Sequence, residues 1–355
     1  MFRLEKRPAP SNTMVLATPL IAVVATMIAG GALFYALGKD PVEAIRIIFV
    51  DPLFDPFSRS ELLVKGAPLL LIALGLAIGF RAGVWNIGAE GQFVIGALAG
   101  GAMGLAFYDT PGVWLLPLMT LSGAIGGFAW AMIPAWLRIR FGANEILVSL
   151  MLVYVAILLL SALVSGPLRD PDGFNFPESR LFHDSATLPI ILSGTRVHSG
   201  VLFALATLIA LYITFQFHAL GYQIRLIGDA PRAARFAGVS HNAVIAGCLG
   251  LSGALAGIAG TFETAGPVGQ LVPALPAGYG FTAIIVAFLG RLHPLGIAAA
   301  AFVMALTYIG GESAQLLLNL PAAAISVFQG MLLFFLLGLD VLITHRLVRT
   351  GRGAR

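Results

Sequence analysis

Ten apolar stretches follow one another along this chain and limit its possible folds more than any other feature; all are near the length of a membrane-spanning helix except the eighth, which is short. A bilayer core of about 30 Å requires roughly 20 apolar residues per helix. Only 11% of the residues are charged, whereas soluble domains average about 25%. The sequence therefore predicts an all-α polytopic membrane protein with about ten transmembrane helices, near residues 14–37, 61–80, 88–107, 112–137, 145–165, 199–218, 242–265, 279–290, 295–311 and 321–343.

The distribution of basic residues predicts the side of the membrane that each loop faces. With the amino terminus inside, the inner segments hold about twice as many lysines and arginines as the outer ones, as the positive-inside rule requires. We therefore predict that both termini are cytoplasmic and that residues 14–37 form an uncleaved first helix. The formal net charge of +4 is modest and does not indicate a nucleic-acid partner.

The stretch from Gly79 to Gly104 is apolar and rich in glycine, yet it carries Arg81, Asn86, Glu90 and Gln92. An ionisable residue at membrane depth costs about 2.5–3.5 kcal/mol on insertion scales, so such a side chain should face protein or water. We interpret the stretch as the bent start of a membrane helix that lines a path for a polar solute. The alternative is a short cytoplasmic loop that caps a close-packed helix.

A second break is expected in the other half of the chain, where glycine and proline crowd residues 266–280. We expect a re-entrant piece around Leu271–Ala277. Residues 75–92 and 257–274 both place a glycine-rich break and a glutamine beside a membrane helix, which indicates a weak internal repeat with broken helices. Matching interrupted helices indicate a midplane path in transporters. The residues that we assign to the translocation path are Asn86, Glu90, Gln92, Phe93, Gln270 and Tyr279.

The inner loop 219–241 predicts a short helix, Pro231–Phe236, that projects into the cytoplasm and is closed by Gly238. Proline suits the first turn of a helix, and an acid near the start, here Asp229, favours the helix dipole. The alternative is a basic loop that only satisfies topology. On the outer side, the loop 166–198 either docks a partner or serves as an ordered connector.

Several chemistries have no support in the sequence. The six histidines form no metal-binding pair of the H-x-x-x-H or HExxH type, and no phosphate-binding G-x-x-x-x-G-K-[ST] motif occurs. The glycine clusters 96–104 and 123–127 favour close helix packing over phosphate binding. No linear chain of carboxylates is evident, so the energy source for transport is expected to be external. A self-contained secondary carrier or channel for a small polar solute is the alternative, and a membrane enzyme is the third class.

Two motifs carry a resemblance to a known family. The segments FRAGVWNIGAEGQ (80–92) and NEILVSLMLVYVA (144–156) resemble the permease subunits of bacterial ABC importers of the branched-chain amino acid, ribose and nucleoside group. They look most like the longer permease of the nucleoside branch, which depends on a lipoprotein. IGDAPRAARFAGVS (227–240) is similar to the family's cytoplasmic loop. Ser149 and Val153 stand where many relatives carry threonine and asparagine, which leaves the substrate open.

The resemblance implies a single permease domain over 1–355, with a first helix at 14–37, a core at 61–342 and a coupling loop at 219–241. It implies a multi-pass subunit of the bacterial plasma (inner) membrane that imports a nucleoside or sugar-like solute by alternating access. The expected partners are a separate ABC ATPase that carries ATP-Mg, a second permease, and an extracytoplasmic binding lipoprotein or periplasmic protein. The chain itself would bind no cofactor and would not be an enzyme. The residues that would couple to the ATPase are Gly228, Asp229, Ala230, Pro231, Ala234, Arg235 and Gly238.

Overall fold

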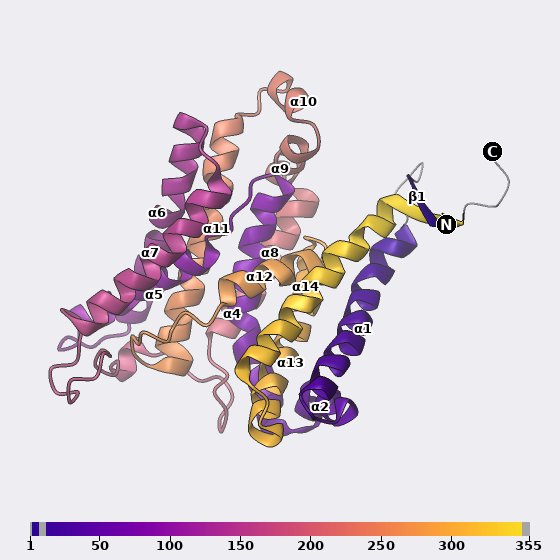
Figure 1. Ribbon diagram of the computed structural model, residues 1–355. Coiled ribbons are helices and arrows are strands. Elements are labelled where there is room, and N and C mark those ends of the chain that lie inside the picture. Colours follow the sequence, from indigo (N-terminus) through magenta and orange to yellow (C-terminus); the bar gives the residue numbers. More distant parts are fainter. Residues whose placement is uncertain (1, 7–11, 350–355) are drawn as a thin grey trace. The chain divides into compact units, whose positions relative to one another are not determined.

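The computed structural model describes residues 2–6 and 12–349, and these are mostly helical (Figure 1). The predicted inner residues Arg7, Arg352 and Arg355 lie outside the described residues. In chain order the elements are β1 (Phe2–Lys6), α1 (Asn12–Ala36), α2 (Pro41–Phe49), α3 (Asp51–Phe54), α4 (Pro56–Arg81), α5 (Ala89–Ala106), α6 (Leu115–Phe141), α7 (Glu145–Ser165), η1 (Asp184–Ala186), α8 (Gly200–Phe217), α9 (Ala219–Asp229), α10 (Pro231–Phe236), α11 (His241–Glu263), η2 (Thr264–Val268), α12 (Tyr279–Leu289), α13 (Pro294–Leu318), α14 (Ala322–Thr344) and β2 (His345–Arg349).

Within the described residues, eight helical stretches are long and apolar enough to cross a membrane, so the protein is a polytopic membrane protein as predicted. They correspond to α1, α4, α6, α7, α8, α11 with η2, α13 and α14. The other two predicted stretches, 88–107 and 279–290, are the helices α5 and α12. Helix α12 has 11 residues and is too short to span the bilayer core by itself at 1.5 Å per residue.

The chain divides into two compact units, one of residues 1–58 and 306–355 and the other of residues 59–305. In the first unit, a core of large apolar side chains joins α1 and α2 to the end of α13 and to α14; its members are Phe34, Ala44, Ile47, Ile48, Ala314, Leu320, Ile325 and Phe328. Strands β1 and β2 pair antiparallel, with Phe2 opposite Arg349. The first and last described residues therefore lie next to each other, and the placement of both termini in the cytoplasm stays a prediction.

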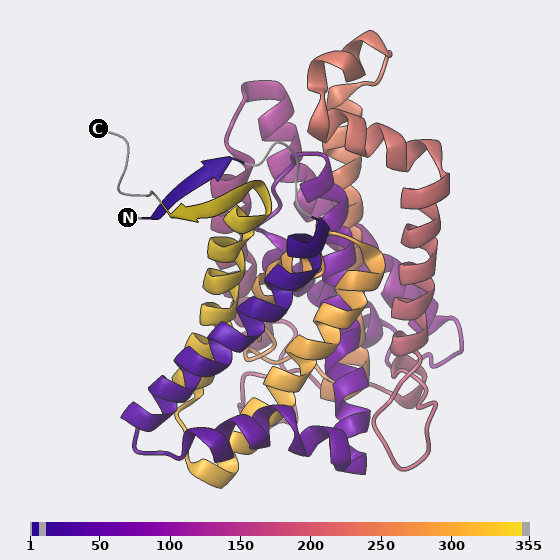
Figure 2. The same cartoon turned by 90° about the vertical axis from the view of Figure 1, so that its right-hand side faces the viewer.

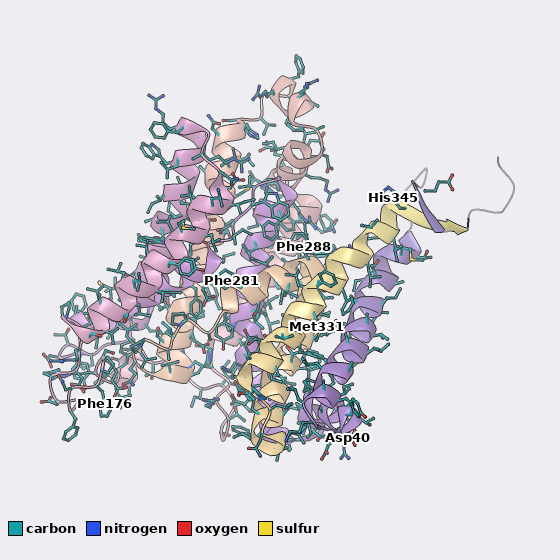
Figure 3. The ribbon with its side chains drawn as sticks, viewed as in Figure 1. Asp40, Phe176, Phe281, Phe288, Met331 and His345 are labelled. Carbon is teal, nitrogen blue, oxygen red and sulfur yellow. The ribbon has the colours of Figure 1, made fainter. Side chains whose placement is uncertain are left out.

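Helix α2 lies between the first two predicted spans and belongs to this first unit. The carboxylate of Asp40 caps it by accepting a hydrogen bond from the backbone N–H of Val42 at 2.8 Å. Ala44, Ile47 and Ile48 of α2 are buried while Val42 is exposed, so the helix presents one apolar face to the core. Figure 3 labels Asp40 at the start of α2 and Met331 on α14.

In the second unit, α5, α6 and α11 approach one another through glycines. A β-carbon on Gly96 would lie 2.1 Å from the Cα of Gly257, and one on Gly257 would lie 2.2 Å from the carbonyl oxygen of Gly123. The hydroxyl of Thr261 donates a hydrogen bond to the Gly96 carbonyl at 3.1 Å. Small residues allow such close approach of helix backbones in membranes. The predicted packing role of these glycine clusters is confirmed, and it fixes the position of α5.

Two elements mark opposite ends of the second unit. Helix α10 projects beyond the neighbouring helices at one end (Figure 1, Figure 2), and the loop 166–199 lies at the other. The predicted short helix is confirmed at Pro231–Phe236, and Gly238 adopts the left-handed conformation with φ of 77° that ends it. We call these the α10 end and the loop end below.

Both predicted breaks are also present in this unit. The first lies between α4 and α5, at residues 82–88. The second follows α11, which loosens into the π-helical turn η2 and gives way to residues 269–278, which are not helical, before α12 begins. Gly83 and Gly269 turn the two breaks with φ of 70° and 77°. Whether the two halves are related by a structural repeat stays a prediction.

The glycine packing predicts that substitution by alanine lowers stability at one position of α11 and leaves it unchanged at another. Changing Gly257→Ala places a methyl group against the backbone of α6, at Gly123 and Gly127, and should lower the free energy of unfolding by about 1–3 kcal/mol. Gly247→Ala is the matched control, because a β-carbon there meets nothing within 4 Å. The apparent midpoint of thermal unfolding in detergent measures both variants. Equal midpoints would contradict the packing role of Gly257.

Candidate functional site

The candidate site begins at the break between α4 and α5. The carbonyl of Gly79 accepts hydrogen bonds from the backbone N–H groups of Ala82 and Val84, each at 2.9 Å, which closes α4. Gly83 follows with positive φ, a conformation that glycine adopts without strain. The chain therefore leaves α4 in a defined turn, and this turn carries Asn86 into the interior.

Asn86, Gln92 and Ser252 form a buried cluster of polar side chains. The amides of Asn86 and Gln92 bond to each other in both directions, at 2.8 and 3.0 Å, and Asn86 Nδ2 also donates to the Ser252 hydroxyl at 3.0 Å. Asn86 Oδ1 further accepts from the backbone N–H of Gly88 at 3.1 Å, at the start of α5. All three side chains are 1% exposed. Asn86 is thus an interior residue and does not belong to an exposed loop.

Glu90 joins the two broken regions. Its carboxylate accepts hydrogen bonds from the backbone N–H groups of Gly278, at 2.9 Å, and Gly280, at the amino-terminal end of α12. A carboxylate is favourable there because the first N–H groups of a helix lack partners within the helix and carry partial positive charge. Glu90 is 1% exposed, so it faces protein as the sequence predicts.

Tyr279 and Phe93 lie beside Glu263, a buried carboxylate that is not among the predicted path residues. The hydroxyl of Tyr279 donates to Glu263 Oε1 at 3.2 Å, and the rings of Tyr279 and Phe93 have their centroids 5.7 Å apart. The ammonium of Lys65 lies 5.6 Å from the centre of the Tyr279 ring. Glu263 is an ionisable residue within an apolar stretch of the sequence. This feature was the one sign in the sequence that it is a functional residue.

Towards the loop end, Glu61 and Arg196 form an ion pair across 135 positions of sequence. Arg196 Nε donates to Glu61 Oε1 at 2.9 Å, and Nη2 bonds the second carboxylate oxygen. Glu61 is 2% exposed. A bidentate arginine–carboxylate pair holds both groups in one geometry. Arg196 lies in the loop that precedes α8, whereas Glu61 lies inside α4, so the pair ties this loop to a membrane helix.

Next to this pair, His198 is 4% exposed and accepts a hydrogen bond from the backbone N–H of Gly200 on Nδ1, at 3.2 Å. Burial lowers the pKa of His198 to about 4, and the nearby charge of Glu61 only partly opposes this shift. The imidazole is therefore neutral at physiological pH.

The loop 166–199 is hydrogen-bonded along the second break. Backbone N–H groups of Ser179, Phe182 and Leu188 donate to the carbonyls of Leu271, Gly269 and Ala265 at 3.0, 2.8 and 2.7 Å. The side chain of Gln270 donates to Glu178 Oε2 at 3.0 Å. The loop therefore supplies the hydrogen bonds that an unwound segment at membrane depth needs, and Gln270 contacts this loop instead of the amide cluster.

Taken together, these side chains form a series that follows α4 and α11 from the α10 end towards the loop end. We call this series the polar column: Asn86, Gln92, Ser252, Glu90, Glu263, Tyr279, Lys65, Glu61 and Arg196. Of the six residues that the sequence assigned to the path, Asn86, Gln92, Glu90 and Tyr279 lie in it and Phe93 packs against it. Gln270 lies at the loop end of the unit, beside Glu178.

The predicted coupling residues lie together at the α10 end. Asp229 and Pro231 lie where α9 meets α10, and α10 is exposed except for Ala234, which is 1% exposed. Arg235 is exposed, and Ala230 connects the two helices by accepting from the N–H of Ala234 at 3.0 Å. Phe236 is 95% exposed; the sequence analysis did not select it, although an aromatic side chain on a polar loop was a visible signal.

Gly228 brings this end into contact with the first break. A β-carbon on Gly228 would lie 2.0 Å from the carbonyl oxygen of Arg81, the last residue of α4. The Arg81 side chain donates from Nε to the carbonyl of Leu292 at 2.9 Å, and its guanidinium lies 4.1 Å from the centre of the Phe215 ring. Arg81 therefore ties α4 to α8 and to the turn after α12, directly beneath α9.

The residues that the structure describes include no group of three or more side chains suited to hold a metal ion. The arrangement instead suits passage of a solute: a membrane-spanning helical unit with polar side chains buried along its length. The fold and site thus define the class of polytopic membrane permeases.

Comparison with known proteins identifies the family. The chain belongs to the branched-chain amino acid transport system permease component family, whose profile matches residues 58–337. It is therefore a multi-pass subunit of the plasma membrane that forms the translocation part of an ABC transporter. No solved structure is a significant match to this chain.

Three relatives match over nearly their full length. A glucose ABC transporter permease of Haloferax volcanii is 38% identical over 95% of this chain and 90% of its own. A guanosine permease of Bacillus subtilis is 28% identical over 90% and 92%, and a nucleoside permease of Lactococcus lactis is 26% identical over 92% and 92%. In both bacteria a second permease protein of the same named function also matches, at 28% and 23% identity.

The contact of Glu90 with α12 generates a prediction on stability. Glu90→Ala removes the acceptor of two backbone N–H groups and should lower the free energy of unfolding by about 2–6 kcal/mol, because each buried donor left without a partner costs about 1–3 kcal/mol. Glu312→Ala, an exposed carboxylate of α13, is the control. Thermal unfolding in detergent reads out both. A Glu90→Ala protein as stable as the control would show that the bonds to Gly278 and Gly280 contribute nothing.

His198 generates a prediction on pH. Its pKa is about 4 in the folded protein and about 6.5 when unfolded, so the unfolded state binds more protons between these values and stability rises with pH across that window. The contribution, about 3 kcal/mol, is fully present above pH 6.5 and is lost as the pH falls towards 4. His198→Asn keeps an acceptor for Gly200 but cannot titrate. The wild type should lose more thermal stability than this variant between pH 7 and pH 4.5; parallel profiles would refute the shift.

Proposed function

We propose that this chain imports a neutral, hydroxyl-rich solute, a nucleoside or a simple sugar, through the polar column by alternating access. The names of the relatives support this solute class, since they include permeases for glucose, guanosine and nucleosides. During passage, the hydrogen bonds that the column residues now make with each other would be replaced by bonds to the hydroxyl and amide groups of the solute.

The observation that carries the proposal is that the carboxylates of the polar column already have bonding partners within the protein. Glu61 is paired with Arg196, the Glu90 carboxylate is bonded by two backbone N–H groups, and Glu263 is bonded by Tyr279. The amide pair of Asn86 and Gln92 offers both donors and acceptors without charge. An ion of either sign would leave one group of such a column uncompensated, whereas a neutral polar solute would not.

A separate ATPase is proposed to drive transport through the α10 end. Phe236, Asp229 and Arg235 present an exposed aromatic ring and both signs of charge on a short projecting element, which suits docking into a groove of another subunit. Ala234 anchors this element, Gly238 ends it, and Gly228 rests on the carbonyl of Arg81. Movement of α9 and α10 would thus reach the first break and Asn86 through direct backbone contact.

Other partners follow from the same proposal. A second permease is supported by the pairs of permease proteins that match in two organisms. A binding lipoprotein or periplasmic protein would dock at the loop end, where Phe174 and Phe176 are 93% and 62% exposed; Figure 3 shows Phe176 pointing away from the helices. ATP-Mg would be bound and hydrolysed by the ATPase alone, so this chain would bind no cofactor and catalyse no reaction.

Reconstitution tests the proposal against its alternative. The chain with its ATPase, second permease and binding protein in proteoliposomes should accumulate labelled guanosine or glucose only when ATP is present on the ATPase side. A self-contained carrier or channel would instead move solute through liposomes that hold this chain alone. Uptake by the chain alone at the rate of the full assembly would overturn the proposal.

The coupling assignment predicts that Asp229→Lys and Arg235→Glu separate ATP hydrolysis from uptake. Each reversal disrupts the charges of the docking element, so uptake should fall at least about tenfold, which corresponds to about 1.4 kcal/mol of coupling. Gly228→Ala should do the same because its methyl group displaces Arg81. Glu43→Lys, an exposed charge reversal on α2, is the control. ATPase activity and uptake are measured on the same vesicles, and normal uptake by all three variants would refute the assignment.

A further inference from the structure

A pocket of about 350 Å³ lies at the loop end, between the carboxyl-terminal part of α5 and the beginning of the loop 166–199. Its polar lining comes from Tyr108, Asp109, Arg169 and Arg180, and Leu105 and Pro167 contribute apolar wall. This volume falls within the range of about 300–1,000 Å³ that is usual for small-molecule sites. None of these residues belongs to the polar column.

Several side chains of the pocket are held in place before any ligand binds. The guanidinium of Arg180 lies 5.7 Å from the centre of the Tyr108 ring and bonds Asp170 at 3.3 Å and Asp172 at 3.0 Å. The ring of His183 meets the Tyr108 ring edge to face, with 6.3 Å between centroids. Arg169 is fixed by Asn175. Side chains fixed in this way lose little conformational entropy when a ligand binds.

The chemistry of the lining selects the class of ligand. Arg180 is balanced by two aspartates, and Asp109 stands opposite in sign to Arg169, so an anion or a cation would meet a like charge at short range. A carboxylate accepts hydrogen bonds on two oxygens and a guanidinium donates several in a fixed plane, so neighbouring hydroxyl groups suit both. The aromatic ring and apolar wall suit the flat face of a sugar or a base.

The position of the pocket links it to the second break. Arg180 follows Glu178 and Ser179 directly, and these two residues bond Gln270 and Leu271. Helix α5 runs from the pocket at one end to Glu90 at the other. A ligand that contacts Arg180 and Tyr108 would therefore lie one residue from the hydrogen bonds that hold the unwound segment. It would also lie at the far end of the helix that carries Glu90 and Gln92.

We propose that this pocket, the α5 pocket, is a binding site for a neutral hydroxyl-rich solute at the mouth of the polar column, separate from the column itself. The inference rests on the proposed function, because it assigns to the same solute a first site on the permease. Tyr108 packs on the ring of the solute, and Asp109 and Arg169 bond its hydroxyl groups.

Equilibrium binding to the assembled transporter in lipid nanodiscs, without the binding protein, tests the site. The probes are guanosine and glucose, with inorganic phosphate as an anionic competitor. The wild type should bind the probe that it transports, and Asp109→Ala and Tyr108→Leu should each weaken binding about tenfold or more, while phosphate should not compete. Asp184→Ala, an exposed aspartate of the same loop outside the pocket, should bind as the wild type does.

The outcomes separate the site from the function. ATP-driven uptake together with binding that neither pocket variant weakens, or with no binding of the transported probe, overturns the α5 pocket and leaves the proposed function standing. Competition by phosphate overturns the solute class of the pocket. Absence of ATP-driven uptake of both probes by the wild-type assembly overturns the proposed function, and the α5 pocket with it. To exclude misfolding, both variants must show the thermal unfolding midpoint of the wild type. If Asp109→Ala unfolds at a lower temperature, the test is repeated with Asp109→Asn, which keeps the shape of the side chain.

Discussion

The arrangement of this protein depends on the bond between the Glu90 carboxylate and the first N–H groups of α12. A membrane interior offers no water to satisfy a broken helix, so each free backbone group needs a partner within the protein. Glu90 satisfies Gly278 and Gly280, and the loop 166–199 satisfies Ala265, Gly269 and Leu271 on the other side of the same break. Helix α5 and the loop thus supply hydrogen-bond partners at both ends of the unwound segment 269–278.

Close packing makes that arrangement possible. Glycines on α5, α6 and α11 bring the backbones together, so that a β-carbon on Gly260 would lie 2.0 Å from the carbonyl oxygen of Phe93. This close packing fixes the position of α5 against α6 and α11, so that Glu90 meets α12 and Gln92 meets Asn86. The polar column is then filled by bonds among its own members. On the proposed function, transport through it would require those bonds to be exchanged for bonds to the solute, and neutral donors and acceptors can be exchanged at lower cost than unpaired charges.

The two ends of the second unit reach the column by different routes. At the α10 end, Gly228 touches the last carbonyl of α4, and the chain continues from there through the first break to Asn86. At the loop end, the loop bonds the second break, which continues into Tyr279 and the Glu90 contact. Each break thus connects the polar column to an exposed element. An importer that is driven by a separate subunit needs a connection of this kind.

Local patterns in the sequence determined the apolar helices, both glycine-rich breaks, the helix Pro231–Phe236 and most of the polar residues that lie in the interior, because hydropathy and turn chemistry act over a few residues. The tertiary structure decided which of these residues meet. Glu90 bonds Gly280 across 190 positions, Arg196 bonds Glu61 across 135, and Gln270 bonds Glu178 instead of the amide cluster. Such pairs depend on how glycine faces bring distant helices together, and no single stretch of sequence contains both partners.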